Sequence, residues 1–344
     1  MSPLLTLTIA TIFIVLVFEY TNGFHDAANI IATVIASRAM TPMQAVLTVG
    51  FFEFLGPLLG GTAVANTIGS FIRLDDIDRV ASLIIVLCGL SGAIAWNLLT
   101  WWRGIPSSSS HALVGGLAGV VTISTGADHV AWGYDEMLHG HFSGVTMIIA
   151  ALILSPVMGF VTGYVLHKIM LLLLRGAHPS INRDLRHLQF VTSAGLAFSH
   201  GANDGQKSMG ILTLVLLLGG FIPTFAVPFW VTLACSIAIT AGILSGGWQI
   251  VRTLGFSIYK IRPLHALDSQ LTASAVIFGA SLFGAPVSTT HVVATSIMGI
   301  GASERPKAVR WNKAGEIVAT WLITIPGAAL MSIGVYLAVH TLRI

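Results

Sequence analysis

Apolar segments long enough to cross a membrane recur along the whole chain, and this pattern constrains the fold most. A helix needs about 20 predominantly apolar residues to span a bilayer. Only 9% of the 344 residues are charged, against about 25% in soluble domains, so the chain cannot cover a water-facing surface. Transmembrane β-strands alternate apolar and polar residues, and no segment does so. We therefore expect an all-α polytopic protein surrounded by a lipid bilayer.

Five membrane segments are expected in each half of the chain. In the first half they cover 4–36, 43–66, 80–101, 105–124 and 144–174, and in the second half 189–218, 228–250, 270–283, 285–301 and 315–340. The polar motif 22–29 is expected to interrupt the first segment. That segment lacks a basic leader and an obvious cleavage site, which favours a membrane helix over a removed signal. Full crossing and re-entrant hairpins both stay open for 105–124 and 285–301.

The chain contains an internal duplication, since three pairs of blocks keep the same order and nearly the same separation. They are GIPSSSSHALVGGLAG (104–119) with GAPVSTTHVVATSIMG (284–299), NGFHDAAN (22–29) with HGANDGQK (200–207), and GGTAVANTIG (60–69) with GGWQIVRTLG (246–255). We therefore expect a first repeat at 1–175, a cytoplasmic linker at 176–188 and a second repeat at 189–344.

The basic residues predict how the repeats face the membrane. An odd number of segments in each repeat forces the two repeats into opposite orientations. Lys and Arg accumulate on the cytoplasmic side; with the linker inside, 13 of the 17 basic residues lie inside, three lie outside, and Lys207 falls in a motif. We expect two inverted-topology repeats with both termini outside. Such repeats, with broken helices at the midplane, are typical of secondary transporters.

Two hydroxyl-rich motifs follow helix-breaking Gly and Pro residues. Their hydroxyls are Ser108, Ser109 and Ser110 in the first repeat and Ser288, Thr289 and Thr290 in the second. Ser and Thr cap helix N-termini, and the free N–H groups at such an end form an anion site. Two ends arriving from opposite membrane faces could surround one tetrahedral oxyanion. The alternative is a pair of capped, kinked helices that bind no ligand.

The other pair of motifs carries charge and amide groups at membrane depth. The group comprises Asp26, Asn29, Asn203, Asp204, Gln206 and Lys207. A carboxylate is costly there and is rarely kept without a role. With amide oxygens beside them, Asp26 and Asp204 suit a small hard cation or a proton, while Lys207 could bind the anion or pair with Asp204. A structural ion pair that joins broken helices is the alternative.

Further titratable residues lie in or near these motifs. His25, His111, His200 and His291 belong to them, and imidazole titrates near neutral pH. Coupling to protons is open to these histidines, although hydrogen bonds to broken backbone are the main expectation. Glu19 and Glu53 also lie in apolar segments, where a proton relay and a helix interface are equally supported. No metal site is predicted.

The motifs NGFHDAANIIATVIASRAMTP, SHGANDGQKSMGI, GIPSSSSHALVGG and GAPVSTTHVVATS together resemble the inorganic phosphate transporter (PiT) family. The resemblance covers nearly the whole chain and is strongest to bacterial low-affinity phosphate permeases. It implies a symporter that imports orthophosphate with a cation across the bacterial plasma membrane. In such permeases the coupling ion is usually a proton, and phosphate can travel as a neutral complex with a divalent metal.

The resemblance also implies roles for single residues. Cation or proton coupling would fall to Asp26, Asn29, Asn203 and Asp204, and phosphate binding to Ser108, Ser109, Ser110, Ser288, Thr289 and Thr290, with Gln206 beside them. From the motifs themselves we add Lys207 to the phosphate site and His25 to the coupling group. His25 stands where many sodium-coupled relatives have Asn, which favours H⁺ as the coupling ion and keeps Na⁺ as the alternative. The central loop lacks the long insertion that many relatives carry.

Several other functions lose support. No Walker A pattern is present, so an ATP-driven pump is not expected, and the symmetry of the motifs favours alternating access over a single enzymatic reaction centre. A passive channel, which would conduct without accumulating substrate, is a further alternative. Sulfate is the nearest rival substrate. Cys88 and Cys235 lie in apolar segments, so no disulfide is expected. We expect no cofactor and no nucleic-acid partner, and the oligomeric state stays open, with a homodimer as one option.

Overall fold

The computed structural model describes residues 2–342, and within this range the only β-structure is an isolated bridge between Ile72 and Val130. The first half comprises α1 (Pro3–Ala36), α2 (Pro42–Leu59), α3 (Ala63–Gly69), α4 (Arg79–Trp102), α5 (Ser109–Ser124), η1 (Ala127–His129), α6 (Tyr134–Leu138) and α7 (Gly144–Leu173). The second half comprises α8 (Ile181–Leu218), α9 (Phe229–Ser245), α10 (Trp248–Phe256), α11 (Pro263–Leu282), α12 (Thr289–Glu304), η2 (Pro306–Ala308) and α13 (Trp311–Leu342). The expected all-α fold class is confirmed.

Most helices lie close to the expected apolar segments, but two begin at least seven residues earlier. The expected linker 176–188 contains the start of α8, and α11 begins seven residues before its expected segment. The first turns of α8 carry Asn182, Arg183 and Asp184, so hydropathy does not mark them. At 38 residues α8 is about 57 Å long, which exceeds the apolar thickness of a bilayer.

The expectation that motif 22–29 interrupts its helix is wrong. α1 runs through it as one helix of 34 residues, and α8 runs through the matching motif 200–207 in the same way. An unbroken helix satisfies its own backbone groups, which is essential where water is absent. The breaks fall instead between α2 and α3, before α5 and α12, and between α9 and α10, which are bent by 72°.

Segments 105–124 and 285–301 form the returning arms of two helical hairpins. α5 has 16 residues and is about 24 Å long, too short to cross the apolar core of a bilayer. The end of α5 returns to the start of α4, since Arg73 N donates to His129 O over 2.8 Å. The α11–α12 hairpin closes in the same manner, with His265 Nε2 lying 2.7 Å from Glu304 Oε2. At 16 residues each, the returning arms favour the re-entrant alternative, and the choice between full crossing and re-entrant hairpin stays a prediction.

The two halves interleave. The first helix of each half packs on the second helix of the other, α1 on α9 and α8 on α2, and the last helix packs on the other half's hairpin, α7 on α11–α12 and α13 on α4–α5. Matching glycines allow the closest approaches: a Cβ added to Gly23 would lie 2.2 Å from Ile239 O, and one added to Gly201 would lie 2.4 Å from Glu53 O. Small residues serve helix packing in membranes in this way. The boundaries at 175 and 189 stay a prediction.

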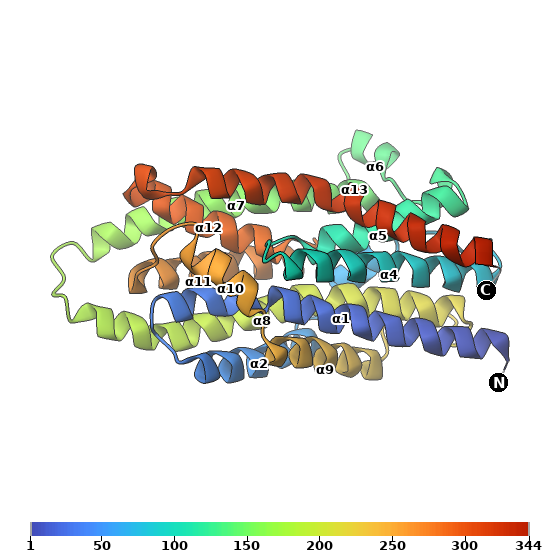
Figure 1. Cartoon of the computed structure of the whole chain (residues 1–344), viewed down its shortest axis with the longest axis horizontal. Helices are drawn as coiled ribbons and strands as arrows, with labels where there is room; N and C mark the ends of the chain where they lie inside the picture. Colours follow the sequence, from blue (N-terminus) through green and yellow to red (C-terminus); the bar gives the residue numbers. More distant parts are fainter. Residues whose placement is uncertain (1, 343–344) are drawn as a thin grey trace.

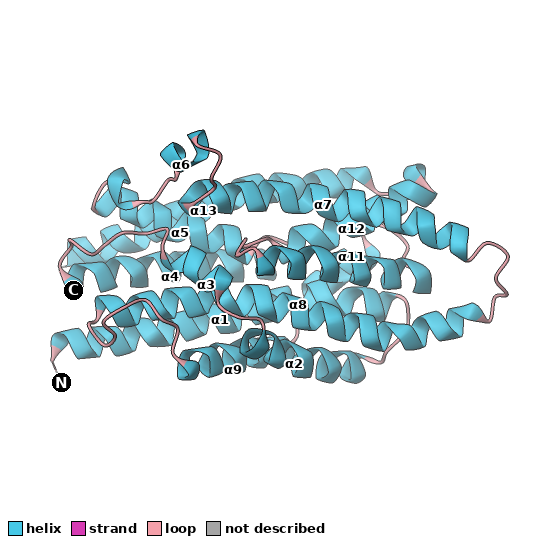
Figure 2. Cartoon of the chain, turned by 180° about the vertical axis from the view of Figure 1, so that it is seen from behind, coloured by secondary structure: helices cyan, strands magenta, loops and turns pink. Residues whose placement is uncertain are grey.

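Corresponding helices run in opposite directions. Figure 1 shows α1 leaving the end of the molecule where both termini lie, whereas α8 starts at the other end, beside the α7–α8 connection. The view from behind in Figure 2 shows the same arrangement, with that connection alone at one end. This antiparallel relation is the inverted repeat that the odd segment count predicts.

The outer faces of the bundle suit contact with lipid. Ile153 and Leu172 of α7 and Leu322 and Leu330 of α13 are each at least 66% exposed, a surface that is unusual in water-soluble monomers. Within residues 2–342, five helices are long and apolar enough to cross a membrane, or six if the bent α9–α10 pair forms one span. α8 is outside this count because its polar motif lowers its hydropathy.

A polar layer separates two apolar clusters inside the bundle. Along α1, residues up to Phe18 belong to one cluster and residues from Ala27 onwards to the other. Along α8 the change falls between Ala197 and Met209. The buried charged residues of both motifs lie in these two intervals, so the fold holds them at the middle of the molecule.

Candidate functional site

Each hairpin turns at a capped helix start, as the hydroxyl motifs predict. Ser108 precedes α5 and accepts a hydrogen bond from His111 N over 3.2 Å, and Ser288 precedes α12 and accepts one from His291 N over 3.3 Å. The positive φ angles of Gly104 (65°) and Gly284 (67°) turn the chain just before these caps, a conformation that glycine adopts without strain. The two tips are therefore built alike.

The tips meet each other at Lys207 of α8. Lys207 Nζ donates to Ser110 Oγ (2.6 Å) on one tip and to Val287 O (2.8 Å) on the other. It also lies 2.5 Å from Asp204 Oδ1. Its side chain is only 2% exposed. The sequence left two roles open for Lys207, pairing with Asp204 and binding the anion. In the structure it pairs with Asp204 and also contacts the hydroxyl group of Ser110.

The two central aspartates meet at one hydroxyl. Thr289 Oγ1 lies 3.2 Å from Asp204 Oδ2 and 3.5 Å from Asp26 Oδ2. Asp26 accepts further hydrogen bonds from Ser109 Oγ (3.1 Å) and from Thr290 Oγ1 (3.4 Å). All of these residues are buried. Carboxylates from α1 and α8 and hydroxyls from α5 and α12 therefore share one enclosed volume.

Each central aspartate has an imidazole beside it. His25 Nδ1 lies 2.6 Å from Asp26 Oδ1, and His200 Nε2 lies 3.3 Å from Asp204 Oδ2. On its other side His200 Nδ1 lies 2.7 Å from Glu53 Oε1. The expectation that these two histidines bond to broken backbone is wrong, since the helices are unbroken and both rings face carboxylates.

The amide side chains take different positions. Asn29 Nδ2 donates to Thr290 Oγ1 (2.8 Å) and so belongs to the centre. Asn203 instead donates to Ser281 Oγ and Ala285 O, which holds the tip of the α11–α12 hairpin. Gln206 bonds to backbone at the α2–α3 break through Gly60 O, Val64 N and its own helix. Both amides support the site from behind and leave the hydroxyl cluster to other donors.

Sequence reasoning left several residues of this network without a role. Ser107 Oγ and Thr100 Oγ1 lie 3.2 and 3.4 Å from His25 Nε2. Glu19, left open between proton relay and helix interface, accepts a hydrogen bond from Ser208 Oγ over 2.5 Å. Its other oxygen is buried and has no hydrogen-bond partner among the described residues. The acidic residues in apolar segments and the first Ser of the SSSS run were the available signals for this network.

The buried charges of this group do not balance. It contains four carboxylates (Glu19, Asp26, Glu53, Asp204), one ammonium group (Lys207) and two imidazoles (His25, His200). Even with both imidazoles protonated, one negative charge stays uncompensated. Burial of an unpaired charge costs several kcal/mol, so the group favours uptake of protons or a cation. Asp26, His200 and Asp204 place ligand atoms within 4.8 Å of one another.

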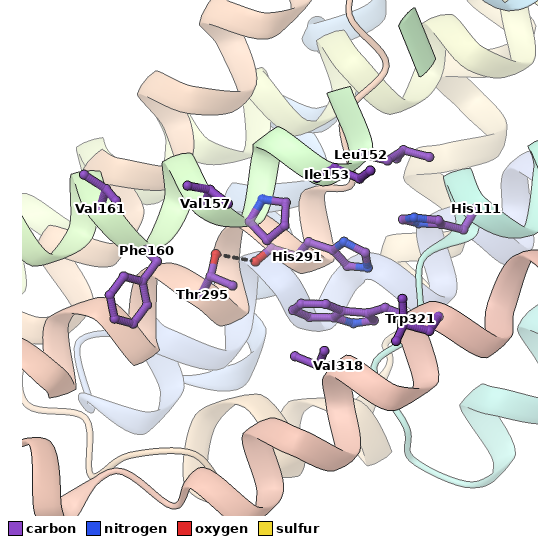
Figure 3. Close-up of a pocket in the computed structure, with 12 residues that line it drawn as sticks. His111, Leu152, Ile153, Val157, Phe160, Val161, His291, Thr295, Val318 and Trp321 are labelled. Carbon is purple, nitrogen blue, oxygen red and sulfur yellow. Dashed lines mark hydrogen bonds between the residues drawn. The ribbon is translucent and has the colours of Figure 1, made fainter. Parts of the chain in front are cut away.

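A separate apolar cavity of about 440 Å³ lies behind the tips. Figure 3 shows the rings of His111 and His291 facing each other beside Trp321, with aliphatic side chains of α7 around them. The two imidazole centroids are 4.7 Å apart, and His291 stacks on Trp321 at 3.7 Å. These two histidines pack in apolar surroundings and contact neither central carboxylate, which separates them from His25 and His200.

Comparisons with known proteins agree with this architecture. Residues 22–183 and 173–332 each match the phosphate transporter family, which confirms that the chain holds two repeats. It is 41% identical over 334 residues to the probable low-affinity inorganic phosphate transporter of Bacillus subtilis (strain 168), with 96% of each chain covered. The corresponding protein of Rhizobium meliloti (strain 1021) is 40% identical over 335 residues, again covering 96% of each.

A solved structure, named the sodium-dependent phosphate transporter, has the same fold. It superimposes with a TM-score of 0.86 at 23% identity and covers 98% of this chain and 99% of that chain. Given the family match over both halves and the identity to full-length relatives, this chain belongs to the phosphate transporter family.

Proposed function

We propose that this protein imports inorganic phosphate by symport with protons across a bacterial plasma membrane. It acts as a transporter and not as an enzyme, in keeping with its relatives, which are named as transporters. The observation that carries the proposal is the juxtaposition at the centre, where two hydroxyl-bearing helix starts meet a lysine beside two imidazole–carboxylate pairs. The first part suits an oxyanion, and the second suits a proton.

The anion would bind where the two tips converge. Ser109, Ser110, Thr289 and Thr290 offer hydroxyl donors, and Lys207 offers a buried ammonium group. Ser108 and Ser288 would contribute the amide-rich helix starts that they cap. The donors now contact one another and the aspartates, so phosphate must replace these contacts with its own. Asn203 and Gln206, placed behind the site, hold the tips and the α2–α3 break in position.

Proton coupling is supported by the partners of the carboxylates. Hard metal cations prefer shells of several oxygen ligands, whereas the nearest partner of Asp26 is an imidazole nitrogen and the nearest partner of Asp204 is an ammonium nitrogen. An imidazole beside a carboxylate can hold or release a proton near neutral pH. A dianion entering a group that is already negative needs added positive charge, and protons on this network supply it. Sodium coupling, which would use Asp26 and Asn29 as oxygen ligands, is the alternative.

Phosphate is favoured over sulfate by the direction of the carboxylates. Phosphate near neutral pH carries a hydroxyl that can donate a hydrogen bond, while sulfate carries none. Asp26 and Asp204 face the same hydroxyls that would hold the anion, so an acceptor for that bond lies within the site. A sulfate ion would leave the acceptor unmatched, which costs affinity.

We propose that the end holding the α7–α8 connection faces the cytoplasm and that both termini lie outside. Basic residues from four parts of the chain line one surface pocket at that end: Arg38, Arg186, Lys260, Arg262 and Arg310. Such accumulation is typical of the cytoplasmic side. Labelling of single cysteines by an impermeant reagent on intact cells tests this orientation. Only cysteines at the end of the molecule where both termini lie should react.

The direct test is uptake of radiolabelled phosphate into proteoliposomes under an imposed pH gradient or an imposed sodium gradient. We expect accumulation driven by the pH gradient without sodium and unaffected by excess sulfate. Dependence on sodium would overturn proton coupling, and competition by sulfate would overturn the substrate preference. Runs with and without magnesium distinguish free phosphate from a neutral metal–phosphate complex.

Replacing Thr289 and Thr290 together by Val should raise the KM for phosphate by about 10-fold or more. Each hydroxyl contributes a hydrogen bond of about 1 kcal/mol, or more where the partner is charged. Val keeps the shape of Thr, so the amount of protein in the membrane should change little. Initial uptake rates at varied phosphate check this, with Thr320→Val, at a half-buried position of α13, as the control. An unchanged KM would show that the two hydroxyls only support the helix start.

A further inference from the structure

A second cluster of metal-ligating side chains lies away from the central site. His167 of α7, His265 of α11 and Glu304 of α12 place their ligand atoms within 4.8 Å of one another. They lie far apart in sequence and belong to three different helices, so no spacing motif could predict the cluster. The three helices meet at the end of the molecule that holds the α7–α8 connection (Figure 1). We propose that this cluster binds one divalent transition-metal ion, with Zn²⁺ as the best match.

The donor atoms converge on one point. Glu304 Oε2 lies 2.7 Å from His265 Nε2 and 3.9 Å from His167 Nε2. Ligands of a tetrahedral zinc ion, each about 2.1 Å from the metal, stand about 3.4 Å apart. The observed separations bracket this value, so small side-chain rotations would complete three sides of a tetrahedron. Two imidazoles and one carboxylate form a donor set that zinc uses when it keeps a fourth position open.

The clearest sign of a ligand is the side chain of His167. It is fully buried, and its Nε2 has no hydrogen-bond partner among the described residues. Its other nitrogen, Nδ1, lies 2.6 Å from Asp268 Oδ2. With the proton held on Nδ1 by that carboxylate, Nε2 presents a lone pair towards Glu304. A buried acceptor without a donor is costly, and a metal ion would satisfy it.

The other two ligands are oriented as well. His265 Nδ1 lies 3.2 Å from Arg262 N and 3.3 Å from Lys260 O. Metal binding at Nε2 requires the tautomer with its proton on Nδ1, and Lys260 O is the acceptor for that proton. Glu304 accepts two further hydrogen bonds, one on Oε2 from Tyr259 OH over 3.2 Å and one on Oε1 from Arg262 Nη1 over 3.3 Å. Metal-binding histidines almost always have a carboxylate or carbonyl behind them in this way. Here Asp268 and Lys260 O take that role.

Charge and access also favour a cation. Among groups in direct contact, the carboxylates of Asp268 and Glu304 face the guanidinium group of Arg262, so with neutral imidazoles these groups keep one negative charge. Lys260 and Arg310 line the same basic pocket as Arg262 and add positive charge nearby. Glu304 is 17% exposed and Arg262 is 51% exposed, so ions can reach the cluster from water. The central group of Asp26, His200 and Asp204 differs, since it is fully buried and its charges belong to transport.

Metal at this cluster would join α7, α11 and α12. α12 carries Glu304 at one end and Thr289 and Thr290 at the other, so the ion would fix the far end of a helix whose start lies at the transport site. A zinc ion here would therefore stabilise one half of the paired hairpins from the side that we assign to the cytoplasm.

Zinc content of the purified full-length protein tests the proposal without phosphate or an ion gradient. After removal of metal by a chelator and dialysis against micromolar zinc, we expect about one tightly held zinc ion per chain by elemental mass spectrometry. Glu304→Gln, which keeps the side-chain shape, and His265→Ala should each lose it. The control His178→Ala removes an exposed histidine of the α7–α8 connection and should keep it. Absence of tight zinc from the wild-type protein, or equal zinc in Glu304→Gln, would overturn the proposal.

Two further measurements separate metal binding from other roles. Asp268→Asn should weaken zinc affinity by about 10–100-fold, as expected for a residue that orients a ligand. Zinc should raise the melting temperature of the wild-type protein and leave that of Glu304→Gln unchanged. Asp204→Asn should retain the zinc, since it alters only the central site. Loss of zinc from Asp204→Asn with retention in Glu304→Gln would place the ion in the transport site instead.

Discussion

The Asp204→Asn variant is expected to lose concentrative phosphate uptake by about 100-fold or more, because groups that transfer protons contribute on this scale. Asp204 contacts the ammonium group of Lys207 through one oxygen, and His200 and the hydroxyl of Thr289 through the other. An amide has nearly the same shape, but it carries no charge and cannot exchange a proton with His200. The coupling of substrate to protons should therefore fail at this residue.

The same variant should stay folded in the membrane. The amide oxygen of Asn can still accept from Lys207, which also keeps Ser110 Oγ and Val287 O as acceptors. Uptake into proteoliposomes under an imposed pH gradient, normalised to reconstituted protein, measures the effect. Asp76→Asn provides the matched control, since this carboxylate is 76% exposed and contacts only His129 among the described ion pairs. Full uptake by Asp204→Asn would remove Asp204 from the coupling mechanism.

Hydropathy predicted most of the helices because lipid demands long apolar helices whatever the tertiary contacts. It could not decide whether 105–124 crosses the membrane. The helix α5 has 16 residues, which is too short to cross, but its apolar sequence resembles that of a membrane-spanning helix. It also missed the first turns of α8, where Arg183 and Asp184 carry the helix beyond the apolar layer. The wrong break at motif 22–29 has a similar origin. Asp26 and Asn29 look like helix breakers in isolation, but partners on other helices satisfy their side chains.

The duplication made the centre of the site predictable. A motif found twice marks positions that symmetry brings together, and Ser109, Thr289 and both aspartates do meet. Residues without a counterpart in the other repeat were harder to place. Glu53 contacts His200 across 147 positions of sequence, and neither local pattern nor repeat offset links the two. The His167–His265–Glu304 cluster has the same character, because each ligand sits on a different helix.

The Lys207→Met variant should lose phosphate uptake and also lose stability. Lys207 carries the one ammonium group of the central cluster, and it joins both hairpin tips to α8. Removing one partner of a buried ion pair typically costs about 3–5 kcal/mol, because the other charge stays behind unpaired. We expect the free energy of unfolding to fall by about this amount. Lys168→Met, at an exposed position of α7, should change neither property.

The double variant Lys207→Met with Asp204→Asn separates the two effects. Once both charges are gone, no ion is left unpaired, so much of the lost stability should return, whereas phosphate uptake should stay absent because binding and coupling groups are both missing. Denaturation of the purified variants and uptake into proteoliposomes measure the two quantities independently. If the double variant stays as unstable as Lys207→Met, the stabilising role of the lysine lies in its bonds to Ser110 and Val287. The main role of the ammonium group would then be to join the two hairpin tips. An entering phosphate would have to displace its hydrogen bonds to Ser110 and Val287.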